Sequence, residues 1–267
     1  DKNMVSWKNF DELNAVKELA ATKEVSLKEV LTAERVGSYC VKMSNGMTYH
    51  YAAKKVDETI LSGLEKLAKE QQLVEKYNLL LNGEVFNTGE KRKVLHQLTR
   101  GQLGEDVVCD GVNKRAYYVE QQNRIAEFAK KVHAGEITNE KGEKFTTAVQ
   151  IGIGGSDLGP RAIYLALELW AKTNNTLKME AKFISNVDPD DAVMVLGNCD
   201  LAHTLFVLVS KSGTTLETLT NESFVKDALV KAGLNPSYHM VAVTSETSPL
   251  ANNPEYLDSF YMDDYIG

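Results

Sequence analysis

The sequence predicts an α/β fold, a doubly wound and mainly parallel sheet preceded by a mainly helical amino-terminal region. Apolar residues recur at three- and four-residue steps in the first hundred-odd residues, as they do on one face of a helix. After Gly142, short β-rich runs alternate with helix-length segments, which indicates parallel strands joined by right-handed crossovers. We therefore expect two domains, a helical region at 1–115 and an α/β domain at 116–267.

The expected elements follow from these periodicities. Amphipathic helices are predicted at 7–23, 56–77 and 117–134, and alternation on both sides of Ser44-Asn45-Gly46 predicts a hairpin over 39–51. Strands are predicted at 147–153, 182–187, 204–209 and 240–244. Helices are predicted between them at 160–172, 189–196 and 214–231. In such sheets ligands bind at the carboxyl ends of the strands.

Composition and charge narrow the classes of partner. With 43% apolar and 25% charged residues among 267, the chain has the balance of a soluble globular protein. Its formal net charge of −7 repels phosphate backbones, so we expect no nucleic-acid partner. A local set of N–H and hydroxyl donors can still hold a small phosphorylated molecule. No apolar run approaches the ~20 residues that span a bilayer, so we expect no membrane partner.

Cysteine and histidine spacing argues against metal binding. Cys40, Cys109 and Cys199 are far apart and odd in number, which indicates neither a disulfide framework nor a zinc site. The five histidines show no H-x-H or H-E-x-x-H pattern. We expect no metal and a reducing, cytoplasmic location.

The first candidate ligand loop spans 152–160, between a predicted strand and a predicted helix. Its glycines let the backbone approach a ligand, the helix start presents unpaired N–H groups, and Ser156 adds a hydroxyl. Asp157 stands where the third glycine of G-x-G-x-x-G belongs, which weakens the alternative of a nucleotide-dependent oxidoreductase. The alternative to a ligand-binding loop is a tight strand-to-helix turn that binds no ligand.

The second candidate loop spans 210–218 and also joins a strand to a helix. Four hydroxyl side chains, one glycine and one lysine fall within its first six residues. Clustered O–H and N–H donors suit the terminal oxygens of a phosphate monoester. Helix capping is the alternative, since Thr214 and Glu217 have the spacing of a capping box. Both interpretations can hold together.

These loops carry a resemblance to a known family. The pattern Ser-x-Ser-Gly-x-Thr at 210–215 resembles the phosphosugar-binding signature of sugar isomerase (SIS) domains. The strings at 149–160, 183–188 and 210–218 resemble the glucose-6-phosphate isomerase (phosphoglucose isomerase) family in order and spacing. Residues 87–96 resemble its N-x-T-E-x-R-A-V-L-H motif, with Gly89 and Lys93 departing from it. The second loop also departs, because many members read S-K-T-F-T-T where Ser212 and Gly213 stand.

The resemblance implies an amino-terminal portion of such an isomerase, including its first SIS domain but not its second. The implied activity is the conversion of glucose 6-phosphate to fructose 6-phosphate in glycolysis and gluconeogenesis, through an enediol and without a cofactor. That chemistry needs a base at the carbon acid and a cation for the enediolate oxygen. The family's catalytic glutamate, histidine, lysine and arginine would lie beyond Gly267. We therefore expect this chain to be inactive alone, and the full-length protein to be a homodimer.

The residues carried over from the family are those of the two loops. The expected phosphate ligands are Gly155, Ser156, Ser210, Ser212 and Thr215, with secondary contacts from Lys211 and Thr214. Glu217 either orients another site group or completes the capping box, and both interpretations stay open. The alternative function is an SIS-domain regulatory module that binds sugar phosphates. Such a module would carry an attached partner-binding domain, and the amino-terminal helices have no basic patch for nucleic acid.

Overall fold

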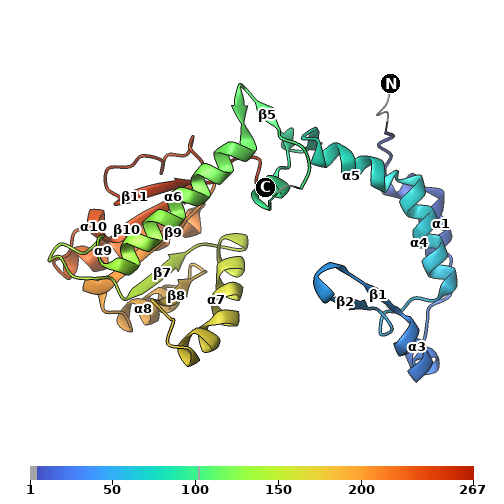
Figure 1. Ribbon diagram of the computed structural model, residues 1–267, viewed down its shortest axis with the longest axis horizontal. Coiled ribbons are helices and arrows are strands. Elements are labelled where there is room, and N and C mark those ends of the chain that lie inside the picture. Colours follow the sequence, from blue (N-terminus) through green and yellow to red (C-terminus); the bar gives the residue numbers. More distant parts are fainter. Residues whose placement is uncertain (1–4, 102) are drawn as a thin grey trace. The chain divides into compact units, whose positions relative to one another are not determined.

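The computed structural model describes residues 5–101 and 103–267, which form two compact units (Figure 1). The first unit extends to Glu84 and the second runs from Val85 to Gly267. The compact units therefore place 85–115 with the sheet, whereas the predicted domain boundary at 115 stays a prediction. Residues 1–4 and 102, which fall in the predicted helical region, lie outside the described residues.

The first unit is built mainly of short helices. They are η1 (Phe10–Glu12), α1 (Asn14–Ala20), α2 (Leu27–Val30), α3 (Ala33–Ser38), α4 (Glu58–Glu70) and α5 (Leu73–Leu81). The predicted helix at 7–23 is interrupted at Leu13, whose backbone is extended. The predicted helix at 56–77 is divided at Gln72, where φ is 52°. The Glu70 carboxylate accepts the first N–H groups of α1, at 2.9 Å, and so replaces a local cap.

The predicted hairpin is confirmed. Strands β1 (Cys40–Lys42) and β2 (Thr48–His50) pair antiparallel across η2 (Ser44–Gly46), where Asn45 adopts a φ of 61°. A buried arginine holds the chain that leaves the hairpin, because the Arg35 guanidinium donates hydrogen bonds to the carbonyls of Ala52, Lys54 and Val56.

The second unit starts with two small hairpins that the sequence patterns did not predict. They pair β3 (Val85–Asn87) with β4 (Arg92–Lys93), and β5 (Val108–Cys109) with β6 (Val112–Asn113), with η3 (His96–Thr99) between them. Helix α6 (Lys114–Ala134) follows and agrees closely with the predicted helix at 117–134. Asn113 caps its start by accepting the N–H of Ala116, and Gly135 ends it with a φ of 75°.

A five-stranded parallel sheet forms the body of the second unit (Figure 1). Its strands are β7 (Thr147–Ile151), β8 (Glu180–Ile184), β9 (Thr204–Val209), β10 (Met240–Thr244) and β11 (Asp258–Tyr261). The intervening helices are α7 (Gly155–Thr173), α8 (Pro189–Gly197), η4 (Leu201–His203), α9 (Leu216–Lys231) and α10 (Pro236–His239). The predicted α/β fold is thereby confirmed. The fifth strand, β11, was missed because its four residues open with Asp and Ser and show no strand-like run.

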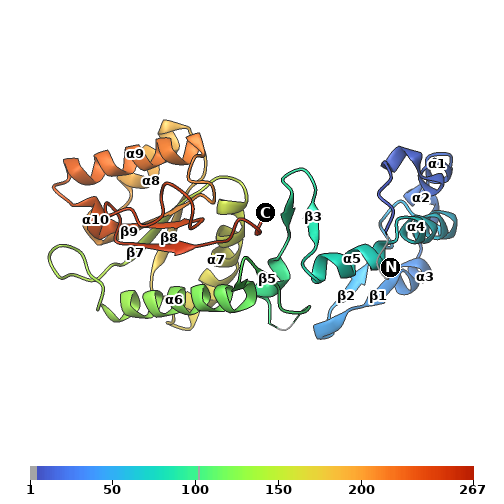
Figure 2. The same ribbon diagram turned by 90° about the horizontal axis from the view of Figure 1, so that it is seen from above.

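The strand order is β11-β10-β9-β7-β8, with every neighbouring pair parallel. The chain therefore moves outward from β7 to β8, returns past β7 to β9, and continues through β10 to β11. The direction of winding reverses between β7 and β9, which makes that junction the topological switch point of the sheet. In Figure 2, α8 and α9 lie above the sheet and α6 lies below it.

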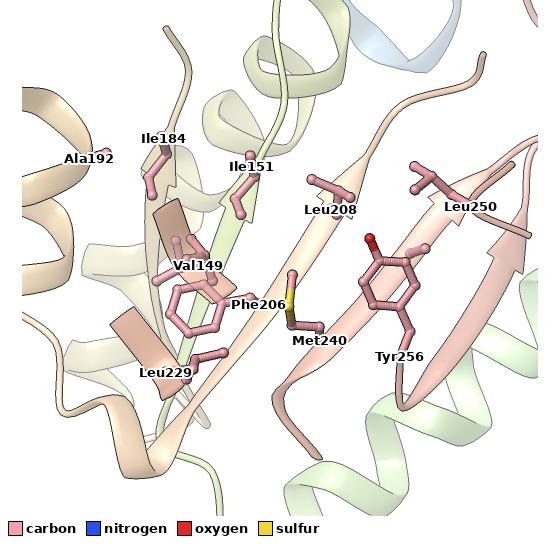
Figure 3. Close-up of a cluster of buried hydrophobic side chains, with 12 residues drawn as sticks. Val149, Ile151, Ile184, Ala192, Phe206, Leu208, Leu229, Met240, Leu250 and Tyr256 are labelled. Carbon is pink, nitrogen blue, oxygen red and sulfur yellow. The ribbon is translucent and has the colours of Figure 1, made fainter. Parts of the chain in front are cut away.

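Both faces of the sheet are buried, as expected for parallel strands between helices. One face packs on α8 and α9, and Figure 3 shows its strand residues beside Leu229 of α9. The fully buried strand residues of this cluster are Val149, Ile151, Ile184, Phe206, Leu208, Met240 and Ala242. On the other face, Val132 of α6 packs with Phe145, Leu205 and Val241. Leu205 and Phe206 lie in opposite clusters because successive strand residues point to opposite faces.

An ion pair at the start of β9 makes stability depend on pH. His203 Nδ1 lies 2.7 Å from Asp200 Oδ2, and that hydrogen bond, with the nearby Glu143 charge, raises the pKa of His203. A raised folded-state pKa stabilises the fold fully below the unfolded value of about 6.5, and the contribution is lost as pH rises through the folded pKa.

We therefore expect Asp200→Asn to lower the His203 pKa, measured by NMR titration of the ring protons. The difference in melting temperature between parent and variant should shrink from about pH 6 to about pH 8, because the imidazolium that Asp200 stabilises disappears. A difference that is the same at both pH values would show that the Asp200 charge does not act through His203.

Candidate functional site

The two candidate loops leave neighbouring strands at the same edge of the sheet. β7 and β9 pair in parallel, and Ile151 at the end of β7 is opposite Leu208. Adjacent strands lie about 4.8 Å apart, so the chain segments that follow them emerge side by side. This edge is the switch point, where ligands of doubly wound sheets bind.

The first loop turns sharply into α7. Gly154 is the N-cap, with φ 57° and ψ −120°, and α7 begins at Gly155, five residues before the predicted start at 160. The N–H groups of Ser156 and Asp157 already donate to carbonyls of the turn. Within residues 5–101 and 103–267, the N–H groups of Gly154 and Gly155 have no hydrogen-bond partner. Unpaired N–H groups at a helix start are the kind of donor that can bind an anion.

Three residues fix the position of Ser156. Pro160 lies inside α7 and has no N–H for the Ser156 carbonyl. The Gln150 side-chain amide supplies the missing donor, with Nε2 2.6 Å from that oxygen. A Cβ on Gly152 would overlap the same carbonyl, so only glycine fits there. The proline, which marked the predicted helix start, is therefore accommodated by a side chain from β7.

Asp157 is buried and paired within its own helix. Its carboxylate takes a bidentate contact from Arg161, with Nη2 to Oδ1 at 2.9 Å. Arg161 Nη2 also lies 3.2 Å from Ser185 Oγ, just beyond β8, and its guanidinium covers the Phe183 ring. The negative charge of the Asp157 carboxylate is thus compensated by an adjacent cation.

The second loop is folded around its own hydroxyl groups. Ser210 Oγ is buried, accepts the Gly213 N–H at 3.1 Å and lies 3.3 Å from Thr215 Oγ1. Ser212 Oγ accepts both the N–H and the hydroxyl of Thr214. In the described part of the chain, the N–H groups of Lys211, Ser212 and Thr215 have no hydrogen-bond partner. The loop therefore offers a second set of free donors at the same edge.

The predicted capping box of Thr214 and Glu217 is wrong. Helix α9 begins at Leu216, and its N-cap is Thr215, which makes no side-chain cap hydrogen bond. The Thr214 hydroxyl donates to Ser212 instead of capping the helix. Glu217 is exposed in the first turn of α9. Its role in orienting another group stays a prediction.

Gly213 is required by both conformation and space. Its φ is 68°, a left-handed value that favours glycine, and a Cβ there would overlap Ser248 Oγ. Ser248 belongs to the turn that follows β10, the next strand along the sheet. The backbone of Lys211 bonds to the same turn, since Ser245 N–H donates to its carbonyl at 3.0 Å. A third strand end therefore supports the second loop.

Lys211 bonds to a neutral oxygen at this edge. Its ammonium donates to the Ile266 carbonyl at 3.2 Å, and within the described residues no carboxylate lies at ion-pair distance from it. A neutral oxygen orders the side chain without cancelling its charge.

Sequence reasoning missed several supporting residues. Gln150 and Gly152 stabilise the first loop, and Ser245 and Ser248 stabilise the second. The run Ser-Glu-Thr-Ser at 245–248 could have been found, because it follows a predicted strand at the same edge. Gln150 gave only a weak signal, a polar residue within an otherwise apolar strand.

A polar cavity of about 680 Å³ lies beside the carboxyl end of β10. Ser245, Lys114, Tyr117 and Asp263 contribute to its walls, and none of the predicted phosphate-binding residues does. Among the described residues no group of three or more His, Cys, Asp or Glu side chains has an arrangement that could hold a metal ion.

The fold and its two donor-rich loops define a doubly wound α/β protein with a candidate anion site at the switch point. The sequence model of the phosphoglucose isomerase family matches residues 50–264. The chain therefore belongs to the phosphoglucose isomerase family.

Curated relatives and a solved structure agree with this assignment. A glucose-6-phosphate isomerase of Treponema denticola is 57% identical over 98% of this chain and 51% of its own length. One from Borreliella burgdorferi is 42% identical over 99% of this chain and 51% of its own length. The crystal structure of a glucose-6-phosphate isomerase from Chlamydia trachomatis, 34% identical, superposes with a TM-score of 0.79 over 97% of this chain and 50% of that one.

The chain spans about half the length of these relatives. Over the residues that the structure describes, none of the helices has the length and apolar character needed to cross a membrane.

The contact between Gly213 and Ser248 predicts a specific rescue. Gly213→Ala should destabilise the chain by about 1–3 kcal/mol, because it adds steric overlap to a strained φ. Removing the Ser248 side chain in the double variant with Ser248→Gly should restore part of that loss, measured by urea unfolding. Strictly additive losses would mean that the Ser248 side chain does not oppose a Cβ at position 213.

Proposed function

We propose that this chain is the phosphate-binding half of a glucose-6-phosphate isomerase, which interconverts glucose 6-phosphate and fructose 6-phosphate. The observation that supports this most directly is the set of free N–H and hydroxyl donors after β7 and β9. Homologues named glucose-6-phosphate isomerase support the substrate class. In this proposal the full-length protein is a cytoplasmic homodimer that needs no cofactor, and its partner is a small sugar phosphate.

The donors of the two loops suit a phosphate monoester. Hydrogen bonds to a charged group contribute about 1.5–3 kcal/mol each, so three or four of them outweigh part of the cost of binding. The proposed ligands are Gly155, Ser156, Ser210, Ser212 and Thr215, with Lys211 and Thr214 in secondary contacts. Because Ser210 Oγ is buried and already accepts the Gly213 N–H, its larger contribution is to hold the loop in shape.

Phosphate binding alone does not isomerise a sugar. Interactions that are equally strong in substrate and transition state lower the dissociation constant without accelerating the chemical step. Proton transfer between C1 and C2 needs a base within hydrogen-bond reach of the carbon acid. In this proposal the base and the assisting cation come from parts of the full-length protein other than the two loops.

The alternative is a regulatory module that binds a sugar phosphate and catalyses nothing in any context. The donor loops fit both functions, whereas the match to the isomerase family over 50–264 favours the enzyme. Titrations of the chain with 6-phosphogluconate and with NADH distinguish the isomerase and the regulatory module from a dinucleotide-binding protein. Binding of NADH without binding of 6-phosphogluconate would reject the proposed function.

Removal of one hydroxyl should weaken binding measurably. We expect Ser212→Ala and Thr215→Ala each to weaken the affinity for 6-phosphogluconate by about 1–2 kcal/mol, roughly 5- to 30-fold, as for loss of one bond to a charged group. Calorimetric titration gives the affinity, and thermal unfolding without ligand separates any effect on helix α9.

The matched control is Thr220→Ala, whose hydroxyl donates to the Leu216 carbonyl within α9. This variant should bind 6-phosphogluconate like the parent chain. Equal affinities for all three variants and the parent would show that Ser212 and Thr215 do not contact the ligand.

Residues 1–267 alone should bind a phosphosugar but not isomerise it. The measurement is hydrogen isotope exchange at C2 of glucose 6-phosphate, with the chain and a full-length relative assayed side by side. Exchange should be found only with the full-length protein, because the loops supply no base to the carbon acid. A rate for the chain near that of the full-length protein would place the catalytic residues within 1–267.

A further inference from the structure

The segment after β11 connects the second candidate loop to the rest of its unit. The Tyr265 carbonyl accepts the Leu95 N–H at 3.1 Å, and the Gly267 carbonyl oxygen lies 2.8 Å from His96 Nε2. Between these two contacts, the Ile266 carbonyl accepts the Lys211 ammonium at 3.2 Å. The segment at 263–267 therefore determines where Lys211 finds its partner.

Asp263 anchors this segment to α6. Its Oδ2 accepts the Tyr118 hydroxyl at 2.7 Å and the Lys114 ammonium at 3.0 Å. The side chains of Asp263 and Lys114 are only 11% and 15% exposed, so water competes little for the pair. Burial and the contact with Asp263 raise the pKa of Tyr118, which keeps its hydroxyl protonated as a donor. The Lys114 ammonium also lies over the Tyr265 ring, 5.2 Å from its centroid.

One turn of backbone couples the position of Asp263 to that of Ile266. The Ile266 N–H donates to the Asp263 carbonyl at 3.0 Å, which closes a turn over 263–266. Because the turn is closed, fixing Asp263 also fixes the Ile266 carbonyl three residues later. In the described structure that carbonyl accepts the hydrogen bond of the Lys211 ammonium. A lysine side chain that is free to rotate loses entropy when it binds an anion, and a fixed acceptor reduces that loss in advance.

We propose that Asp263 is a positioning residue of the phosphate site: through the 263–266 turn it holds the Ile266 carbonyl, and that carbonyl fixes the position of the Lys211 ammonium. The inference rests on the proposed function, since the anion attracted by Lys211 is the phosphate of the sugar. Asp263 itself touches no ligand. Its effect on binding passes entirely through Lys211.

A double-mutant cycle on the chain tests this, with 6-phosphogluconate as the calorimetric probe. Lys211→Met and Asp263→Ala should each weaken binding by about 10-fold or more, the lower end of what one hydrogen bond to a charged group contributes. The double variant should bind no more weakly than Lys211→Met alone, because Asp263 acts only through Lys211. If Asp263 had only a structural role, Asp263→Ala would lower the melting temperature. The fold-losses of affinity of the two single variants would then multiply in the double variant.

Two further variants control for unfolding of Asp263→Ala and for a general loss of stability. Tyr118→Phe removes only the hydroxyl that bonds Asp263 and should weaken binding in the same direction, and again only when Lys211 is present. If Asp263→Ala does not fold, this variant takes its place in the cycle. Glu222→Ala, which removes one of the two carboxylate partners of Lys226 on α9, is the matched control and should lower stability without changing affinity.

The outcomes separate the inference from the proposed function. Independent losses for Asp263 and Lys211, or an unchanged affinity in Asp263→Ala, overturn the positioning role. An unchanged affinity in Lys211→Met together with weaker binding in Thr215→Ala overturns it too, while the phosphate site stands. If the parent chain does not bind 6-phosphogluconate at all, both the inference and the proposed function fail.

Discussion

The candidate site depends on the parallel pairing of β7 with β9. These strands are neighbours only because the chain first moves outward to β8 and then returns past β7, which places the reversal of winding between them. Two segments far apart in the sequence, one rich in glycine and the other in hydroxyl residues, are thereby brought to one edge. Without that pairing each loop would be an ordinary turn between a strand and a helix.

Each loop is shaped by contacts that leave its outward donors free. In the first, Gln150 compensates for Pro160 at the Ser156 carbonyl, and Gly152 lets that carbonyl approach the backbone. In the second, the buried Ser210 hydroxyl holds the Gly213 N–H, and the turn after β10 supports the loop from the side. Because these bonds already exist without a ligand, an anion needs to order little more of the chain on binding.

Much of the fold and of the candidate site could be predicted from the sequence, because local residue patterns determine those parts. Apolar runs gave the strands at 147–153, 204–209 and 240–244 to within two residues, and the glycine and hydroxyl residues marked both loops. What failed depended on contacts distant in the sequence. The start of α7 before Pro160 needs the Gln150 amide, and β11 exists because β10 offers it an edge. The capping box failed because Thr214 bonds Ser212. The role of Asp263 is visible only once α6 and the 263–266 turn lie together.

The central claim is that both loops bind one phosphate. The most direct measurement is an amide NMR titration of the chain with 6-phosphogluconate, which follows the free N–H groups of Gly155 in the first loop and of Ser212 and Thr215 in the second. The account predicts that all three signals shift together with a single dissociation constant, and that inorganic phosphate competes. Shifts confined to one loop, or centred on the cavity beside β10, would contradict it.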